Sequence, residues 1–306
     1  MFALGDTLYG TRKGKRFTGG RFTRNMVMIH DPSHNNCWTQ NAGKNNAGYF
    51  TVRGKANAKN KWFWPGAPFA KGNTVVTPVT LMKRLNASGT GGFNFAQKKS
   101  FVNVSKVSRT TIRSVRTKKL ALTRAQPGGT PISWGAGTHR AGRWTYLAGS
   151  VLRPGQYGHD IYLSRVRTSD LLSTKRSVAG NTAQYLTSTG FTKRAPAGSW
   201  RKVCDGACDS TVSMLSAGGR VHMVTKDHSI LGSTISDYSS SSWAGSWSRK
   251  VVAHAPTKAG TNSYGATVHP NVARSGNLFT ITLNYNTNDG TFDPARYRPA
   301  MFRIAL

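Results

Sequence analysis

The sequence predicts an all-β protein, and the spacing of its turns favours a single five-bladed β-propeller over residues 1–306. Helical patterning is almost absent, and short runs rich in Val, Thr, Ile, Tyr and Trp are separated by Gly, Asn, Ser and Pro. A period near 70 residues accommodates one four-stranded blade and a long loop. A large β-sandwich with coincidental turns is the alternative. The turn glycines that lead into strands, at intervals of 57 to 77 residues, are Gly5, Gly72, Gly142, Gly219 and Gly276.

The expected strands alternate in character along much of their length, as half-buried antiparallel strands do. The two ends of the chain, MFALGDT at 1–7 and RYRPAMFRIAL at 296–306, are strand-like as well. The internal strands are expected at 73–82, 143–150, 160–166, 220–225 and 277–286.

The charge of the chain is strongly one-sided. It has 43 Lys and Arg against 10 Asp, and no Glu, for a formal net charge of +33. Such a charge attracts polyanions over long distances, and it destabilises the compact state unless a partner offsets it. The densest stretch of cations runs from Lys98 to Lys119. The partners expected from the charge are therefore an anionic cell envelope or another polyanion, with nucleic acid as a further candidate.

Location and cofactors are predicted from what the sequence lacks. No apolar run approaches the roughly 20 residues that span a bilayer. The opening MFALGDTLYG is unlike a signal peptide. An extracellular or phage-particle location is expected, with a cytoplasmic chain or a trimmed leader as alternatives. No cofactor is expected, because the sequence has no phosphate-binding Gly loop, nucleophile elbow or zinc pair.

The three cysteines are too few for a disulfide framework. Cys204 and Cys208, in CDGACD, are close enough to form a disulfide across a small loop. A zinc site would need a second pair of ligands that the sequence lacks, and free thiols are the third alternative. Cys37 is left over and is expected to be a small buried residue.

A series of short motifs extends along almost the whole chain. They are LGDTLYG (4–10), RNMVMIHD (24–31), FWPG (63–66), SWGAG (133–137), YGHDIYLSRV (157–166), WAGSW (243–247), YGATVHPN (264–271), LNYNTN (283–288) and YRPAMF (297–302). In this order they resemble a family of five-bladed propellers related to the arabinanase-type glycoside hydrolases. That family was long described as a domain of unknown function, and it includes bacterial endo-D-arabinanases acting on mycobacterial cell-wall arabinan.

The resemblance implies a propeller closed by pairing of the N- and C-terminal strands, which would remove an exposed sheet edge. It also implies an endo-acting glycoside hydrolase whose partner is a polysaccharide. Two departures bear on catalysis. The general acid of arabinanase-type propellers is usually Glu, which this chain lacks, and Ala67 follows FWPG where an acidic residue is often found.

Three residues are the catalytic candidates. Glycosidic hydrolysis needs two carboxyl groups, about 5 Å apart for retention and roughly 6.5–9.5 Å apart for inversion. Asp6 matches the family's GDT motif and would be the general base or nucleophile, and Asp160 in GHDIYLSRV would be the second carboxyl. His269 matches the HPN motif and would orient a carboxylate or bind a sugar hydroxyl. Each has a structural alternative, as a turn, strand-start or packing residue.

Further residues are candidates for contact with a substrate. Flat aromatic rings suit the C–H faces of sugars, and amides, imidazoles and carboxylates suit their hydroxyls. The alternatives are packing for the Trp and His residues, hydrogen bonds to loop backbone for the Asn residues and a turn for Asp31. The candidates are Asn25, Asp31, Trp62, Trp64, Trp134, His159, Asn284 and Asn286, with His30 and His139 as weaker ones. The acidic residues interpreted as surface or turn residues are Asp205, Asp209, Asp227, Asp237, Asp289 and Asp293.

Three classes of function remain open. The first is a glycoside hydrolase acting on arabinan-type cell-envelope polysaccharide, held there by its basic surface. The second is a non-catalytic propeller that binds a carbohydrate or polyanion, which the absence of Glu favours. The third, suggested by charge alone, is a nucleic-acid-binding protein, but the sequence contains no recognisable nucleic-acid module.

Overall fold

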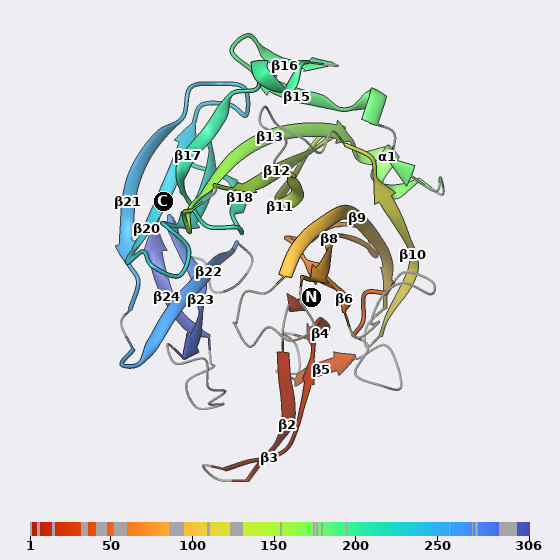
Figure 1. Cartoon of the computed structure of the whole chain (residues 1–306), viewed down its shortest axis with the longest axis vertical. Helices are drawn as coiled ribbons and strands as arrows, with labels where there is room; N and C mark the ends of the chain where they lie inside the picture. The colour runs from red at the N-terminus through yellow and green to blue at the C-terminus, as the bar shows by residue number, and fades with distance from the viewer. Residues whose placement is uncertain are drawn as a thin grey trace. The chain divides into compact units, whose positions relative to one another are not determined.

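The computed structural model shows a chain built of β-strands, with one short α-helix among the described residues (Figure 1). The structure describes residues 2–4, 7–13, 16–31, 36–40, 48–51, 60–85, 95–108, 111–122, 131–153, 155–173, 175, 177–178, 180–193, 195–256, 258–270, 272, 275–287 and 299–306. None of the described helices is long and apolar enough to cross a membrane.

Two compact units are distinguished by their internal contacts. The first comprises Met1–Leu122, Ser133–Gly135 and Arg167–Gly180. The second comprises Thr123–Ile132, Ala136–Val166 and Asn181–Leu306. The single domain over residues 1–306 stays a prediction.

Two sheets and a hairpin form most of the first unit. A three-stranded sheet has the order β1-β4-β5, and β2 pairs with β3. A six-stranded sheet has the order β14-β10-β9-β8-β6, with β7 also paired to β8. Helix α1 (Thr168–Leu172) precedes β14 in the chain. The strands are β1 (Phe2–Leu4), β2 (Thr7–Lys13), β3 (Arg16–Thr23), β4 (Met26–Asp31), β5 (Asn36–Gln40), β6 (Lys61–Pro65), β7 (Phe69–Lys71), β8 (Thr74–Arg84), β9 (Phe95–Val107), β10 (Ile112–Leu120) and β14 (Ser177–Val178).

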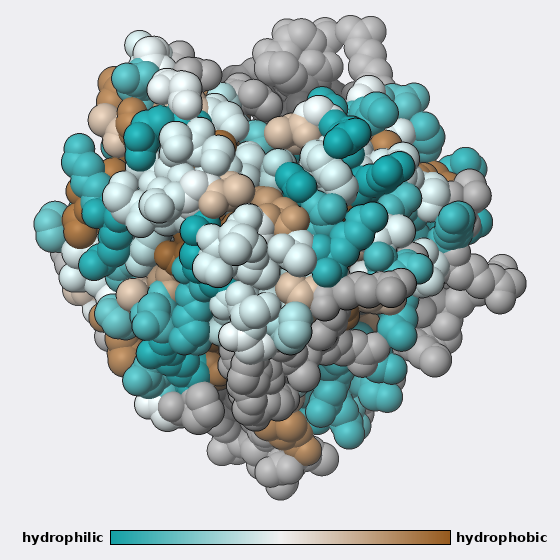
Figure 2. Space-filling view, turned by 90° about the horizontal axis from the view of Figure 1, so that it is seen from above, coloured by the Kyte–Doolittle hydropathy of each residue, from teal (hydrophilic) through white to brown (hydrophobic). Residues whose placement is uncertain are grey.

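The described cations of the densest stretch lie on the neighbouring strands β9 and β10. Lys118 alone among these described cations is buried: its Nζ donates to the carbonyl oxygens of Asp170 and Ser173, both at 2.8 Å, at the end of α1. Burial lowers the pKa of Lys118 to about 8. The exposed cations of the stretch are Lys98, Lys99, Lys106, Arg113, Arg116 and Lys119. The hydrophilic surface in view in Figure 2 has hydrophobic residues only in small separate groups.

Two motif glycines meet in the first unit. A Cβ on Gly66, of FWPG, would lie 2.0 Å from the carbonyl oxygen of Gly135, of SWGAG. A Cβ on Gly135, whose φ is +100°, would lie 2.1 Å from the Cβ of Pro78. Only glycine permits both this backbone conformation and this approach. The FWPG and SWGAG motifs therefore have glycine where their two backbone segments approach too closely for a side chain to fit between them.

Three further sheets form most of the second unit. Their orders are β11-β12-β13-β15-β16 with β17 paired to β13, then β18-β19-β20-β21, then β22-β23-β24. The strands are β11 (Ser133–Ala141), β12 (Trp144–Leu152), β13 (His159–Arg167), β15 (Gln184–Thr187), β16 (Gly190–Lys193), β17 (Lys202–Cys208), β18 (Ser213–Ala217), β19 (Arg220–Lys226), β20 (Thr234–Ser240), β21 (Ser248–His254), β22 (Thr261–His269), β23 (Leu278–Thr287) and β24 (Ala300–Ala305). Sheets that follow one another and are built largely of consecutive antiparallel strands are the topology of a β-propeller.

Strand β23 shows how the sequence pattern places the core. Phe279, Ile281, Leu283 and Tyr285 alternate along it and are buried in one hydrophobic cluster. Burial of each such side chain contributes about 1.5–3 kcal/mol to folding. The alternation leaves Asn284 and Asn286 on the opposite face of the strand, where both are half-buried.

The five internal strands predicted from the sequence are confirmed as β8, β12, β13, β19 and β23, and the predicted terminal strands as β1 and β24. Among the described pairings, β1 pairs with β4 and β24 pairs with β23. The closure of a propeller by the two ends, and its five blades, stay predictions.

Candidate functional site

Asp160, at the start of β13, is the centre of an ion-pair network in the second unit. Its Oδ1 lies 2.7 Å from Arg153 Nε and its Oδ2 lies 3.0 Å from Lys202 Nζ. Asp205 pairs with the same two cations, at 2.9 Å from Lys202 Nζ and in close contact with Arg153 Nη2. Both oxygens of the buried Asp160 carboxylate are therefore occupied. Holding a proton for a leaving group would break an ion pair, so this geometry suits an ionised role.

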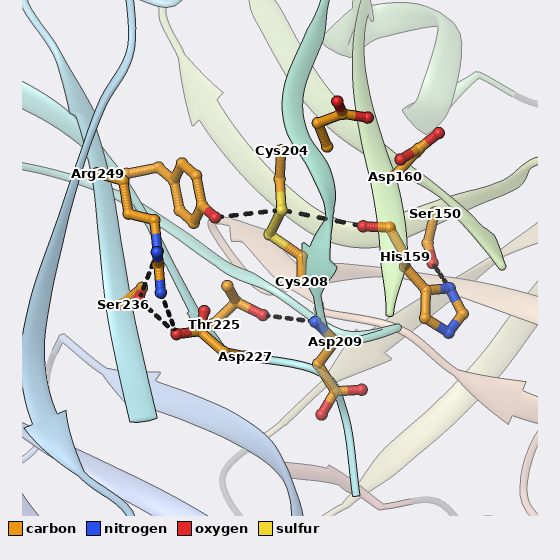
Figure 3. Close-up of a disulfide and its surroundings, with 12 residues drawn as sticks. Ser150, His159, Asp160, Cys204, Cys208, Asp209, Thr225, Asp227, Ser236 and Arg249 are labelled. Atoms are coloured by element: carbon orange, nitrogen blue, oxygen red, sulfur yellow. Dashed lines mark hydrogen bonds and ion pairs between the residues drawn. A yellow bond between two sulfur atoms is a disulfide. The ribbon is translucent and has the colours of Figure 1, made fainter. Parts of the chain in front are cut away.

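Asp205 reaches this network because β17 bulges. His159 pairs with Cys208 and Ile161 with Cys204, so two steps along β13 correspond to four along β17. A disulfide joins Cys204 to Cys208 across the bulge (Figure 3). The Tyr238 hydroxyl lies 3.3 Å from Cys204 Sγ and can donate to it.

The disulfide settles the alternatives that the sequence left open for this cysteine pair. In the described part of the chain, no group of three or more His, Cys, Asp or Glu side chains could hold a metal ion. The side chain of Cys37 lies outside the described residues.

His159 lies beside Asp160 and is also buried. Its Nδ1 is 2.7 Å from the Ser150 hydroxyl oxygen (Figure 3). Burial lowers the pKa of His159, and the carboxylates of Asp209 and Asp160 oppose that shift. The neutral imidazole is thus favoured, which suits hydrogen bonding or a basic role better than proton donation.

Asp209, Asp227 and Asp237 are buried, so the prediction that they lie on the surface is wrong. Asp227 does directly precede a turn, at residues 228–231. Asp209 accepts hydrogen bonds from the Gly265 N–H at 2.8 Å and from the backbone and hydroxyl of Ser210. This carboxylate links the segment before β18 to strand β22. Because burial of a carboxylate without partners would be costly, each of the three accepts at least one hydrogen bond.

Asp227 accepts three bonds at one oxygen. Arg249 Nη2 lies 2.6 Å from Oδ2, Ser236 Oγ lies 2.8 Å from it, and the Thr234 hydroxyl also donates to it. The interpretation as a surface residue is confirmed for Asp205, whose side chain is 68% exposed. Asp289 and Asp293 lie outside the described residues.

His222 on β19 is held between two acceptors. Its Nδ1 is 2.9 Å from Asp237 Oδ2 and its Nε2 is 3.2 Å from the Ala217 carbonyl oxygen. Both ring nitrogens can donate only when the imidazole is protonated. The bond to Asp237 accordingly raises the pKa of His222, although burial opposes the shift.

This pair predicts a pH dependence of stability. A raised folded-state pKa means that His222 stabilises the fold fully below its unfolded pKa of about 6.5. That contribution is lost as the pH rises through the folded-state pKa. We expect the difference in unfolding free energy between wild type and His222→Gln to shrink as the pH rises from 6 to 9, measured by urea denaturation. A difference that is constant or grows with pH would contradict the assignment.

The other predicted residues of the second unit lie on β22, β23 and β11. His269 Nε2 is 2.9 Å from Thr282 Oγ1, and burial lowers the pKa of His269. Asn284 Nδ2 lies 3.4 Å from the Gly265 carbonyl oxygen. Because the Gly265 N–H donates to Asp209, the structure brings Asp209, Gly265 and Asn284 together, and Asp209 was not a site candidate from sequence. His139 Nε2 lies 3.2 Å from Ser216 Oγ and its ring packs on Trp243.

The aromatic and amide candidates of the first unit are mostly packed. The Asn25 amide donates to the Phe63 carbonyl at 2.9 Å and accepts from the Phe50 N–H at 2.7 Å, so both of its ends bind backbone. Trp62 and Trp134 are buried, whereas Trp64 is half-buried. Trp64 therefore retains the most accessible ring of the three. Asp6 and the side chains of His30 and Asp31 lie outside the described residues.

Comparison with known proteins gives a family and a fold. A family model described as "Domain of unknown function (DUF5005)" matches residues 1–305. No curated protein matches the sequence. A Bacteroides ovatus protein described as a "putative hydrolase" is 14% identical and has a TM-score of 0.71. The matched region covers 99% of this chain and 81% of the Bacteroides ovatus chain. At this identity the likeness shows a shared fold.

Two more solved structures are less similar. A β-fructofuranosidase mutant of Microbacterium saccharophilum is 10% identical, with a TM-score of 0.49. The match covers 93% of this chain and 62% of the mutant's chain. A GH43 endo-arabinanase of Bacillus licheniformis is 11% identical, with a TM-score of 0.34, and the match covers 81% of this chain and 96% of the arabinanase chain.

Proposed function

This chain belongs to the DUF5005 family, and we propose that it is a polysaccharide-acting β-propeller of the glycoside hydrolase type. The observation that carries the proposal is the ordered set of motifs from LGDTLYG to YRPAMF, in a chain whose strands follow the propeller topology. The "putative hydrolase" from Bacteroides ovatus, which shares the fold over 99% of this chain, is consistent with it.

The finer features of the proposal come from the resemblance and the charge. The propeller has five blades and closes through its terminal strands. The enzyme is endo-acting on arabinan-type polysaccharide of a cell envelope, and its +33 charge retains it on an anionic surface. An extracellular or phage-particle location suits such a substrate.

The catalytic assignment combines a sequence motif with the geometry of the second unit. Asp6 is the proposed base or nucleophile. Asp160 is an ionised carboxylate in this scheme, because Arg153 and Lys202 occupy its oxygens. His269, whose pKa burial lowers, would act as a neutral hydrogen-bonding group. None of these three supplies an evident general acid.

That gap favours a second candidate, a non-catalytic propeller that binds carbohydrate. The chain has no Glu, and the described carboxylates of the second unit are engaged by cations or hydrogen-bond donors. The five carboxylates concerned are those of Asp160, Asp205, Asp209, Asp227 and Asp237.

A panel of furanose polymers separates the two candidates. An endo-acting hydrolase should lower the viscosity of arabinan well before many reducing ends accumulate, because internal cleavage shortens chains with few cuts. Binding to the same polymers without cleavage would favour the non-catalytic protein. Neither binding nor cleavage across the panel would contradict both.

Retention on a polyanion column is predicted to be strong and sensitive to salt. A protein that neutralises many negative groups releases their counterions, so its affinity falls steeply as salt rises. Heparin should retain the protein beyond physiological ionic strength, and a neutral arabinan column should show no comparable salt dependence. Elution from heparin at low salt would contradict the prediction.

A further inference from the structure

Arg165 on β13 is held between two aromatic rings. Its guanidinium carbon lies 4.5 Å from the centroid of the Trp144 ring and 4.6 Å from that of Phe191. Trp144 belongs to β12 and Phe191 to β16, so the contacts join strands of one sheet. Cation–π contacts of this kind hold the guanidinium in place and leave its N–H groups available for hydrogen bonds.

A hydrogen bond also fixes the Nε side of the Arg165 guanidinium. Arg165 Nε donates to Gln184 Oε1 at 2.6 Å, and the two residues are direct partners in the β13–β15 pairing. Within the described residues, no hydrogen bond or ion pair involves the two terminal nitrogens of Arg165. The side chain is therefore ordered before any ligand arrives, with its two-nitrogen end unused.

The surroundings of Arg165 are positive. Lys193, the exposed partner of Gln184 in the β15–β16 pairing, lies two strands from Arg165, roughly 10 Å away across the sheet. The guanidinium carbon of Arg143 lies 5.6 Å from the Trp144 ring. None of these three cations takes part in an ion pair among the described residues. Such a concentration of unpaired positive charge favours an anionic ligand.

We propose that Arg165, with Lys193 beside it, binds the anionic group of an acidic polysaccharide. A planar guanidinium with two free terminal nitrogens matches a two-oxygen anion, which a uronate carboxylate or a sugar phosphodiester supplies. The inference rests on the proposed function and extends it from neutral arabinan to an acidic glycan. The site comprises Arg143, Trp144, Arg165, Gln184, Phe191 and Lys193.

The same geometry disfavours recognition of unpaired bases by stacking. Proteins that bind single strands stack the bases on accessible aromatic rings. Here the guanidinium of Arg165 already packs on Trp144 and Phe191. A ligand of this site is thus recognised through its charge and the spacing of its oxygens.

The test compares Arg165→Lys and Arg165→Gln with the wild type by titration calorimetry at one fixed ionic strength. The probes are polygalacturonate, glycerol-phosphate teichoic acid, neutral arabinan and a single-stranded oligodeoxythymidine. Lys250→Gln is the matched control, because it removes one exposed positive charge from β21, outside the site. Loss of a bidentate, charge-assisted contact should weaken binding to an acidic probe about tenfold in both Arg165 variants. Lys250→Gln should change it less than about twofold.

Each outcome decides. A loss confined to polygalacturonate identifies a carboxylate ligand, and one confined to teichoic acid a phosphodiester. The proposed site would be overturned if Arg165→Lys bound the acidic probes as tightly as the wild type, or if Lys250→Gln lost as much affinity as the Arg165 variants. Either result would mean that the overall positive charge binds the probes. A loss confined to the oligonucleotide would overturn it in favour of nucleic acid.

If the Arg165 variants do not fold, Lys193→Gln takes their place. Weaker binding of this variant to the acidic probes would support the proposal, and unchanged binding would contradict it. Hydrolysis of neutral arabinan by the wild type is measured in parallel. If the wild type does not hydrolyse arabinan, the proposed hydrolase function is contradicted. The proposed anion site is then tested by the binding measurements alone.

Discussion

Replacing Asp6 by asparagine is expected to lower the turnover of an arabinan-type polysaccharide by orders of magnitude, roughly 10³-fold or more. Asparagine keeps the size of the side chain and removes its charge, so it can act neither as nucleophile nor as base. With no Glu in the chain, another carboxylate would have to be an Asp at a different position. Melting temperature and retention on heparin should be nearly unchanged, which separates a loss of chemistry from a loss of fold or of polyanion binding.

Asp170→Asn is the matched control for this variant. It makes the same change of charge at a half-buried side chain of helix α1, outside the ion-pair network of Asp160. Equal activity in wild type and Asp6→Asn would exclude the proposed role of Asp6. Activity absent from both, with binding retained, would move the non-catalytic protein to first place.

The strands could be predicted because their signals are local. In β23 the alternation of Phe279, Ile281, Leu283 and Tyr285 is visible in ten residues of sequence, and one buried face produces it. Strands β9 and β10, which contain most of the cations between Lys98 and Lys119, were not predicted from the sequence. Their many exposed Lys and Arg residues interrupt the alternation of apolar and polar residues that indicates a strand.

The buried carboxylates could not be predicted because their partners are distant in sequence. Asp209 follows a small-residue segment and resembles a turn residue, yet its acceptor oxygen binds the N–H of Gly265, 56 residues away. Asp227 and Asp237 likewise depend on Arg249 and His222. Burial at these positions follows from packing between strands, which composition around a residue does not report.

The same reason explains the missed Arg165 site. Trp144, Arg165, Gln184 and Phe191 come from four strands, and nothing in their sequence neighbourhoods links them. The disulfide was an open alternative because CDGACD is local. The ion pair of Asp160 with Lys202 instead depends on the pairing of β13 with β17, two strands that are distant in the sequence.

Gly135→Ala is expected to destabilise the protein by about 3–5 kcal/mol. Two separate costs add at this position. The φ of +100° is one that residues with a Cβ rarely adopt, and the new methyl would lie 2.1 Å from the Cβ of Pro78. Pro78 belongs to β8 and cannot swing away as a flexible side chain could, and the Gly135 carbonyl is itself held close to Gly66.

Gly142→Ala isolates the first of those costs. Gly142 has φ +55° and open space where its Cβ would be, so alanine there should cost only about 1–2 kcal/mol. Urea denaturation of the two variants measures the difference directly. Equal destabilisation would mean that the approach of Gly135 to Pro78 relaxes at no cost. A gap of about 2 kcal/mol or more would show that the glycines of FWPG and SWGAG are required by close backbone packing, which ties two of the motifs behind the family resemblance to the fold rather than to catalysis.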